Sequence, residues 1–395
     1  MKVLVAGGGS GGHISPIIAI ISRLREDNPS IKIFFVGSKG GIEEKLIPQT
    51  GIRFLHIRCG KFSRYHKNML INILDPTTII KNVKGLVNFL LGISDSIKVL
   101  KKIKPDIVFL KGGFVSLPLG LACRLKGYPY LLHESDAVMG LANRILAKKA
   151  ETVFVSFPEK NYPEVNPEKI IYSGNPIRPD VLTGEREEAK RILKLEEDIP
   201  TIMIIGGSQG AHLINELILD ELEKFLQKFQ LIHITGDYDY DYVEYRRKEL
   251  STNLKNRYYV YGFLTNNLKD AYAASDLVIT RAGNNILTEL AALGKPAVVI
   301  PLDSSANNHQ RINATTFSRE GAAYVLSQGK IKGGDLLRQA ELIIENDEER
   351  EFLSKKIKQF YKPEATKVIA EKIKEIYQRR QEEEAREKKS KSQKD

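Results

Sequence analysis

The hydrophobic positions in the first half of the chain form short apolar runs separated by segments of helical periodicity. The first run, residues 2–6, leads into a glycine cluster and then into residues 16–24, which have the spacing of an amphipathic helix. Further apolar runs bounded by turn residues lie at 32–37, 107–110, 130–133 and 152–156. This alternation predicts a parallel sheet with crossover helices, as in a Rossmann-like domain.

The same pattern starts again after a connection that is rich in proline. Five prolines lie between residues 157 and 180, so no long helix or strand fits there. A strand at 201–205, a glycine turn and a helix at 212–229 follow, and further strands are expected at 231–235, 258–261, 277–280 and 297–301. The predicted fold class is therefore α/β, with two Rossmann-like domains facing a cleft.

An internal repeat supports this division. VAGGGSGGH at residues 5–13 aligns with IIGGSQGAH at 204–212, each at a strand-to-helix junction. The chain of 395 residues is also longer than one hydrophobic core usually organises. We expect an N-terminal domain at 1–165, a C-terminal domain at 174–350, a helix at about 352–377 that packs back on the first domain, and a charged tail at 378–395.

The formal net charge of +11 is unevenly distributed. Residues 60–104 hold nine basic and two acidic side chains, a net charge of +7, together with apolar clusters at 69–74 and 86–93. Such a segment is typical of proteins that dock on anionic lipid, so Gly60 to Lys104 is predicted to bind the cytoplasmic face of the cell membrane peripherally. The alternative is that these segments are amphipathic helices that face the core while their lysines are solvated.

Composition argues against several classes of protein. The N-terminal apolar run is too short for a signal peptide, and no run approaches the roughly 20 apolar residues of a membrane span. Cys59 and Cys123 lack the spacing of a disulfide framework or a zinc site, which favours a reducing compartment. The chain has no RNA-recognition motif and no tryptophan, so no nucleic-acid partner is expected.

Glycines at the two strand-to-helix junctions are the first candidates for chemistry. Gly7, Gly9 and Gly12 fit the G-x-G-x-x-G pattern of dinucleotide-binding loops. The next strand ends in the letters VGSK, without the acidic residue that a nicotinamide enzyme uses to hold the ribose, which counts against a dehydrogenase. Backbone N–H groups and the helix dipole suit a diphosphate at either loop, although each loop alone is also compatible with a simple tight turn.

Three further features carry candidate side chains. His13 lies where the first helix begins, and a neutral imidazole there could take the proton of an attacking hydroxyl; a helix cap or a substrate hydrogen bond is the alternative. Glu289 lies one turn into a helix that starts near Asn284, where a carboxylate either accepts from both hydroxyls of a ribose or is a surface charge. The run DYDYD at 237–241 is similar to the Asp-x-Asp of metal-dependent glycosyltransferases, but we interpret it as solvated loop acids and expect no metal.

Seven motifs together resemble those of the MurG family. They are GGGSGGH (7–13), KGGFVSLP (111–118), HES (133–135), GNPIR (174–178), GGSQGA (206–211), TRAG (280–283) and NHQ (308–310). The resemblance implies a GT-B fold and inverting transfer of N-acetylglucosamine from UDP-N-acetylglucosamine to the 4-hydroxyl of MurNAc in lipid I, giving lipid II for peptidoglycan synthesis. It implies no cofactor. A related transferase that acts on diacylglycerol or another lipid is the alternative.

The resemblance also implies roles for individual residues. Glu289 would hold the ribose, and the remaining contacts to the donor would come from Ser208 and Arg178 at the diphosphate, Gln310 at the sugar, Leu264 at the uracil, and Asn284, Asn285 and Ile286 on the phosphate side. Ser10, Gly11 and Gly12 would bind substrate beside the catalytic His13. One stretch departs from the family. Where the family has HEQN followed by proline, this chain has HESDAVMG at residues 133–140. Asp136 thus replaces an asparagine whose amide donates hydrogen bonds, which leaves the sugar contact and the acceptor preference open to change.

Overall fold

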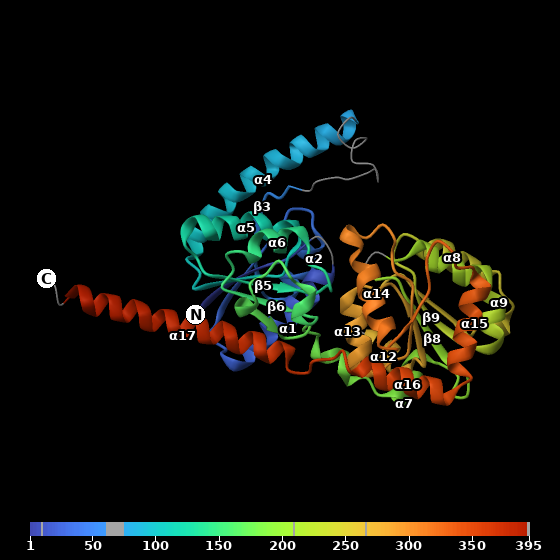
Figure 1. The fold of residues 1–395 in the computed structure, drawn as a ribbon. Helices are drawn as coiled ribbons and strands as arrows, with labels where there is room; N and C mark the ends of the chain where they lie inside the picture. Colours follow the sequence, from blue (N-terminus) through green and yellow to red (C-terminus); the bar gives the residue numbers. More distant parts are fainter. Residues whose placement is uncertain (9–10, 61–74, 208–209, 265–266, 393–395) are drawn as a thin grey trace. The chain divides into compact units, whose positions relative to one another are not determined.

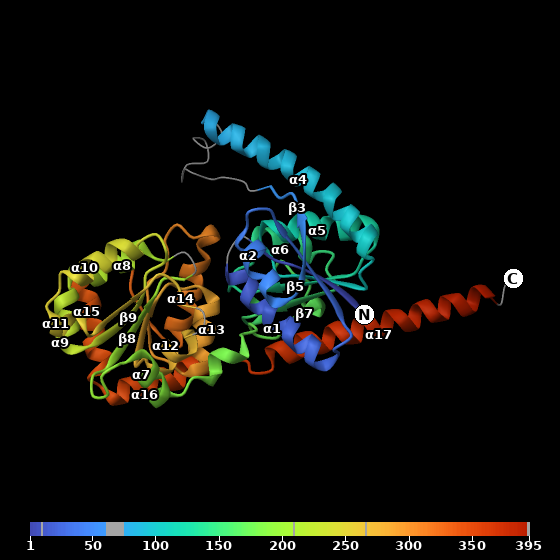
Figure 2. The ribbon, with the colours of Figure 1, turned by 180° about the vertical axis from the view of Figure 1, so that it is seen from behind.

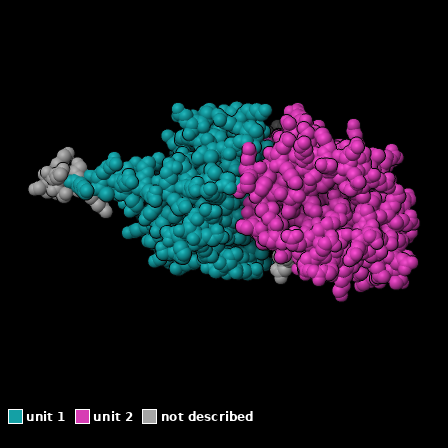
Figure 3. All heavy atoms as spheres, turned by 90° about the horizontal axis from the view of Figure 1, so that it is seen from below, with its two compact units in different colours: residues 1–135, 139–176, 364–395 teal, residues 136–138, 177–363 magenta. Residues whose placement is uncertain are grey.

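The computed structural model describes residues 1–8, 11–60, 75–207, 210–264 and 267–392. They form two compact units, coloured separately in Figure 3. Unit 1 comprises Met1–Ser135, Met139–Pro176 and Glu364–Asp395, and unit 2 comprises Asp136–Val138 and Ile177–Pro363. The chain therefore enters unit 2 briefly at residues 136–138, within the segment where the sequence departs from the family.

Unit 1 is built on a seven-stranded parallel sheet with the order β3-β2-β1-β4-β5-β6-β7. Its strands are β1 (Lys2–Ala6), β2 (Lys32–Ser38), β3 (Arg53–Ile57), β4 (Ile107–Leu110), β5 (Tyr130–Glu134), β6 (Thr152–Val155) and β7 (Ile170–Tyr172). The five strands predicted from apolar runs are all present, and the two that were not predicted, β3 and β7, lie at the edges. The strand order reverses between β1 and β4, which is where α/β sheets of this kind bind ligands.

Helices cover both faces of this sheet. They are α1 (Gly11–Asp27), α2 (Ile42–Leu46), α4 (Pro76–Ile103), α5 (Gly113–Lys126), α6 (Leu141–Ala147) and α17 (Ala365–Ser392), with 3₁₀ turns at η1 (Pro48–Thr50), η2 (Glu159–Asn161) and η3 (Pro167–Lys169). α17 returns from the end of the chain to lie along α1, as Figure 1 and Figure 2 both show. Ile369, Ile373 and Ile376 fix α17 there because they are buried in the core of unit 1.

The prediction of one continuous helix at about 352–377 is wrong, because two helices occupy this range. Its first part belongs to α16 (Asp347–Lys358), which packs against α13 (Asn284–Leu293) in unit 2, and its second part belongs to α17. Pro363 lies between the two, in a position where a helix cannot continue without losing a hydrogen bond. The helix α17 also extends through most of the charged tail.

Unit 2 has a six-stranded parallel sheet with the order β10-β9-β8-β11-β12-β13. Its strands are β8 (Thr201–Ile205), β9 (Gln230–Ile234), β10 (Tyr258–Tyr261), β11 (Leu277–Thr280), β12 (Ala297–Val299) and β13 (Tyr324–Val325). Its remaining helices are α7 (Arg186–Leu193), α8 (His212–Asp220), α9 (Leu222–Lys228), α10 (Tyr240–Lys248), α11 (Thr252–Lys255), α12 (Leu268–Ala274), α14 (His309–Arg319) and α15 (Gly333–Ile344), with η4 (Pro179–Thr183) and η5 (Ala306–Asn308). The helix predicted at 212–229 is two helices, because the backbone leaves the helical region at Glu221 (φ −123°, ψ 24°).

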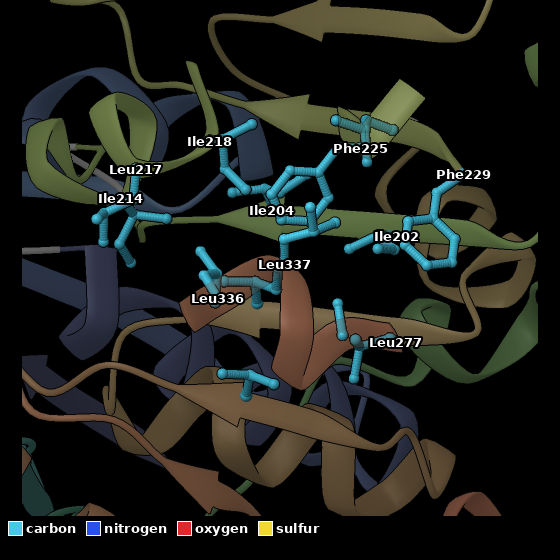
Figure 4. Close-up of a cluster of buried hydrophobic side chains, with 14 of the residues drawn as sticks. Ile202, Ile204, Ile214, Leu217, Ile218, Phe225, Phe229, Leu277, Leu336 and Leu337 are labelled. Atoms are coloured by element: carbon cyan, nitrogen blue, oxygen red, sulfur yellow. The ribbon is translucent and has the colours of Figure 1, made fainter. Parts of the chain in front are cut away.

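The core of unit 2 explains why its central strands could be predicted. In Figure 4, Ile204 of β8 lies beside Ile218 of α8, and Ile202 of the same strand lies beside Phe229. Leu336 and Leu337 of α15 belong to the same cluster. These isoleucines are fully buried, and burying one such side chain contributes about 1.5–3 kcal/mol to folding. The apolar run therefore marks the strand. The loops of the candidate site follow the carboxyl ends of these strands.

Candidate active site

The first glycine loop connects β1 to α1 at the point where the strand order of unit 1 reverses. Ser10 lies outside the described residues, while Gly11 and Gly12 are the first two residues of α1 and the half-buried His13 is the third. A Cβ on Gly113, which has a φ of +77°, would overlap the carbonyl oxygen of Gly8 and lie 3.6 Å from Cε1 of His13. The glycine at position 113 thus lets the turn after β4 approach the first loop closely, with the His13 imidazole beside it.

Three of the sequence motifs meet next to this loop. Lys111, which is 2% exposed, donates from its ammonium to the Ser135 hydroxyl, and that hydroxyl donates to Oδ1 of Asn175 at 3.1 Å. His133 is buried, and Nε2 of its ring lies 3.0 Å from the carbonyl oxygen of Gly174. Burial, aided by the nearby Lys111 charge, holds the pKa of His133 well below its ordinary value, so the ring is neutral and donates to Gly174.

A buried carboxyl group that no sequence motif indicates lies against the first glycine loop. Glu43 of α2 is fully buried, and its Oε1 accepts from the Ser38 backbone N–H at 3.1 Å and from the Ser38 hydroxyl at 2.8 Å. A Cβ on Gly8 would lie 2.5 Å from the same oxygen, so a larger residue at position 8 would have to displace the buried Glu43 carboxyl group. β2 ends without an acid, as expected from the letters VGSK, but the next helix supplies one to the loop.

The second glycine loop connects β8 to α8 in unit 2. Ser208 lies outside the described residues, but Gly207 and Gly210 have φ values of +96° and +75°, which glycine adopts without strain. A Cβ on Gly210 would also overlap the carbonyl oxygen of Thr235. The turn thus depends on its glycines, as the sequence repeat predicts.

The interpretation of DYDYD as solvated acids is wrong for its central residue. Asp237 and Asp241 are exposed, but Asp239 is only 5% exposed. Its Oδ1 lies 3.0 Å from Nδ1 of His212, and its Oδ2 accepts from Nδ2 of Asn215 at 2.7 Å. Asp239 therefore orients the first turn of α8, and the described part of the chain contains no group of three side chains that could hold a metal ion.

Glu289 lies in the second turn of α13 and is buried rather than on the surface, with 7% of the residue exposed. Its Oε2 accepts from the hydroxyl of Tyr272 on α12 at 2.8 Å. Burial raises the pKa of Glu289 to about 7, while the Tyr272 hydrogen bond and the Arg178 charge oppose that rise. Asn284, Asn285 and Ile286 form the first turn of the same helix, so Arg178, Glu289 and this helix start are brought together in unit 2.

The remaining predicted residues lie on loops and helix starts of unit 2. Gln310 is in the first turn of α14, and its Oε1 accepts from the Leu302 N–H at 3.0 Å, so its amide NH₂ is the group suited to a sugar hydroxyl. Asn307 and Asn308 precede it with φ values of +53° and +55°, strained positions that are enriched at functional sites. Leu264 is half-buried after β10.

Asp136 has a partner of its own within unit 2. Its Oδ1 accepts from Nδ2 of Asn313 at 2.9 Å, and Oδ1 of Asn313 accepts from the Ala137 N–H at 2.8 Å. Asn313 is fully buried. The carboxyl group that stands in place of the family asparagine is therefore held by the side-chain amide of Asn313 on α14, which donates to it.

A second candidate surface lies on α4 in unit 1. Asp75 caps this helix by accepting from the Thr77 and Thr78 N–H groups, and Arg58 holds it through two 2.7 Å bonds to Asp95. Between residues 79 and 91, α4 exposes a row of large apolar side chains, namely Ile79, Ile80, Val83, Leu86, Val87, Leu90 and Leu91. The predicted apolar cluster at 69–74 lies outside the described residues, and no described helix has the length and apolarity needed to cross a membrane.

Family models identify the class to which this fold and these loops belong. Residues 3–155 match the glycosyltransferase family 28 N-terminal domain, and residues 201–369 match the C-terminal domain of the same family. The two parallel α/β sheets and the glycine loop that each unit carries fit this class, which confirms the predicted GT-B fold.

Individual relatives narrow the class further. The UDP-N-acetylglucosamine--N-acetylmuramyl-(pentapeptide) pyrophosphoryl-undecaprenol N-acetylglucosamine transferase 2 of Bacillus cereus is 38% identical over 379 residues, 95% of this chain and 99% of that protein. The transferase of Clostridium botulinum with the same name, without the numeral, is 35% identical over 348 residues, 87% and 91% of the two chains. The crystal structure of Acinetobacter baumannii MurG aligns with a TM-score of 0.69 at 25% identity, covering 95% and 99%. The chain belongs to the MurG family.

Proposed function

We propose that this chain transfers N-acetylglucosamine from UDP-N-acetylglucosamine to the 4-hydroxyl of MurNAc in lipid I and so makes lipid II. The observation that carries the proposal is the grouping of the buried Glu289 with Arg178 at the start of α13, an arrangement suited to a nucleoside diphosphate. The names of the B. cereus and C. botulinum relatives supply the identity of the sugar and of the acceptor.

The donor would be held by unit 2. An ionised Glu289 can accept from both ribose hydroxyls, while Arg178 and the second glycine loop, with Ser208, neutralise the diphosphate. The N–H groups of Asn284, Asn285 and Ile286 add the positive end of the α13 dipole. Gln310 donates to a sugar hydroxyl, and the Leu264 backbone contacts the uracil.

The chemical step is a single displacement at C1 of the sugar. The acceptor's 4-oxygen forms a bond to C1 from the face opposite the diphosphate, the C1–O bond to UDP breaks with its electron pair leaving on UDP, and the configuration inverts. The hydroxyl proton passes to His13, whose imidazole lies beside Gly113 in unit 1, with Gly11 and Gly12 starting the helix that carries it. The helix and loop amides then stabilise the departing UDP.

The lipid acceptor requires the enzyme to work at a membrane surface, and α4 is suited to that task. Its exposed apolar row lies next to Lys81 and Lys84, and Lys98, Lys101 and Lys102 are exposed farther along the helix. Each lysine near anionic headgroups contributes about 1 kcal/mol, and inserted leucine and isoleucine side chains add hydrophobic burial. We place this surface on the cytoplasmic leaflet, with the enzyme bound peripherally.

Two acceptors test the proposal directly. The chain is incubated with radiolabelled UDP-N-acetylglucosamine and either lipid I or diacylglycerol in detergent micelles, and the labelled lipid is separated by chromatography. Label in the lipid I product alone, with release of UDP, is the expected result. Label in diacylglycerol alone would replace the proposed acceptor by the alternative lipid, and label in neither would remove the proposed activity.

A further inference from the structure

The hydrogen bond between Tyr272 and Glu289 is unusual because both groups are taken out of water. Tyr272 of α12 is fully buried, Glu289 of α13 is 7% exposed, and the hydroxyl oxygen lies 2.8 Å from Oε2 of the carboxyl group. A carboxylate in such a place is costly unless it is paired or hydrogen-bonded. Burial of an ionisable group whose charge is opposed by desolvation is a feature of ligand-binding sites, which favours a role for the carboxyl group toward a ligand.

The charged and titratable groups around Glu289 come from several elements. Tyr272 approaches from α12, while Arg178 and Asp180 approach from the start of η4, the arginine favouring the ionised carboxylate and the aspartate opposing it. Lys358 of α16 lies beside Gly294, at the other end of α13. Burial is the main cause that raises the pKa of Tyr272 well above its ordinary value, and the neighbouring Glu289 carboxyl group adds to it. The hydroxyl therefore keeps its proton and remains a donor.

A vicinal diol needs two acceptor positions on one ionised carboxylate. The Tyr272 hydroxyl bonds Oε2 from the interior and leaves Oε1, with the remaining lone pair of Oε2, for the two hydroxyls. We propose that Tyr272 is a positioning residue of the nucleotide site, whose buried hydroxyl fixes the orientation of the Glu289 carboxylate for the ribose diol. Because this bond also favours the ionised carboxylate, binding of the UDP-sugar should release a proton. This inference rests on the assignment of Glu289 to the ribose under the proposed function.

The pH dependence of binding follows from this arrangement. Because the pKa of Glu289 is raised to about 7, the carboxyl group of the free protein is mostly protonated below that pH, and donor affinity falls about tenfold for each further pH unit. Above pH 8 the affinity is constant. Removing the Tyr272 hydroxyl takes away a hydrogen bond to the ionised form, so the midpoint moves upward by about one pH unit and binding at pH 7 weakens about five- to tenfold.

The test is titration calorimetry of the full chain with UDP-N-acetylglucosamine between pH 5.5 and 8.5, in pairs of buffers with different ionisation enthalpies. The diphosphate of this ligand has no group that titrates near neutrality, so proton release reports on the protein. The variants are Tyr272→Phe, Glu289→Gln and, as a matched control, Tyr258→Phe, which removes another buried hydroxyl of unit 2, bonded to Nδ1 of His233 at 2.7 Å. Circular dichroism checks that each variant folds.

We expect proton release by the parent near pH 6.5, a midpoint shifted upward in Tyr272→Phe, an unshifted midpoint in Tyr258→Phe, and weaker binding without this titration in Glu289→Gln. If Glu289→Gln lowers affinity but Tyr272→Phe leaves the profile unchanged, the role of Tyr272 is refuted while the ribose assignment stands. If Glu289→Gln binds the donor with the parent's affinity and pH profile, the ribose assignment is refuted, and the proposed role of Tyr272 is refuted with it. If Tyr272→Phe does not fold, the proposal is tested by the proton release of the parent alone. The absence of proton release near pH 6.5 would then overturn the proposal.

Discussion

The buried Glu289 should make the free protein less stable at neutral pH than a neutral side chain would. Below pH 4.5 the carboxyl group is protonated in both the folded and the unfolded chain, and above about pH 7 it is ionised in both. Between these values the unfolded chain has lost the proton while the folded chain keeps it, so stability falls as pH rises. A shift from 4.5 to about 7 corresponds to about 3 kcal/mol, at 1.36 kcal/mol per pH unit.

Glu289→Gln removes this titration while keeping an acceptor for the Tyr272 hydroxyl. The free energy of unfolding of unit 2, measured for the variant minus the parent, should therefore increase by about 2 kcal/mol between pH 5.5 and pH 8.5. Glu348→Gln is the control, because Glu348 is an exposed acid of the same unit on α16. The same substitution should weaken binding of UDP, so the residue exchanges stability for ligand affinity.

The assay must follow unit 2 alone, since a chain with two units need not unfold in one step. Guanidinium titrations read by pulse-labelling hydrogen exchange, using peptides from β8 and β11, report on the central strands of unit 2. A difference between variant and parent that stays the same at both pH values would refute the reasoning, because it would mean that Glu289 does not titrate between them. A change of equal size in Glu348→Gln would show that the effect is not specific to the buried site.

Three other predictions concern the chemistry and the membrane. His13→Ala should lower kcat by about 100-fold or more with little change in the donor KM, and a raised KM with normal kcat would make His13 a binding residue. Activity should survive excess chelator; loss that manganese restores would instead favour a metal at Asp237 to Asp241. Leu90→Glu combined with Lys84→Glu should weaken sedimentation with anionic vesicles, most clearly at low salt, without slowing turnover of a soluble acceptor analogue, and unchanged sedimentation would place the membrane surface elsewhere.

The parts of the fold that sequence reasoning found are those where burial on both faces of a strand produces an apolar run. β1, β4 and β8 lie at the centre of their sheets and were predicted within a residue or two. β3, β7 and β13 were missed because they are edge strands in which most residues are not buried, so their letters lack that run. The edge strand β10 is also mostly not buried, but it was predicted because its letters YYVY are strongly β-prone. The division between α16 and α17 had a local signal in Pro363, which the prediction of one continuous helix overlooked.

The candidate site divides in a similar way. The glycine loops could be predicted because positive φ values and close backbone approach leave a mark in the sequence, as at Gly113 and Gly210. The partners beside them could not, since Glu43 binds Ser38 at the end of β2 and lies against Gly8, and Asp239 holds the start of α8, only through tertiary packing. Tyr272 is 17 residues from Glu289 and belongs to a different helix, a separation that no motif spans.

The two units show how one scaffold can serve two chemical purposes. The order β3-β2-β1-β4-β5 in unit 1 has the same form as β10-β9-β8-β11-β12 in unit 2, and each unit carries a glycine loop after its central strand. What differs is the side chain that lies near this loop, at the carboxyl ends of the strands. Unit 1 offers a half-buried imidazole beside a tight glycine turn, suited to accepting a proton, whereas unit 2 buries a carboxylate beneath a helix start, suited to a ribose. Since the backbone repeats and the buried partners do not, the proposed roles of the two units differ through side chains such as His13 and Glu289 rather than through the loops themselves.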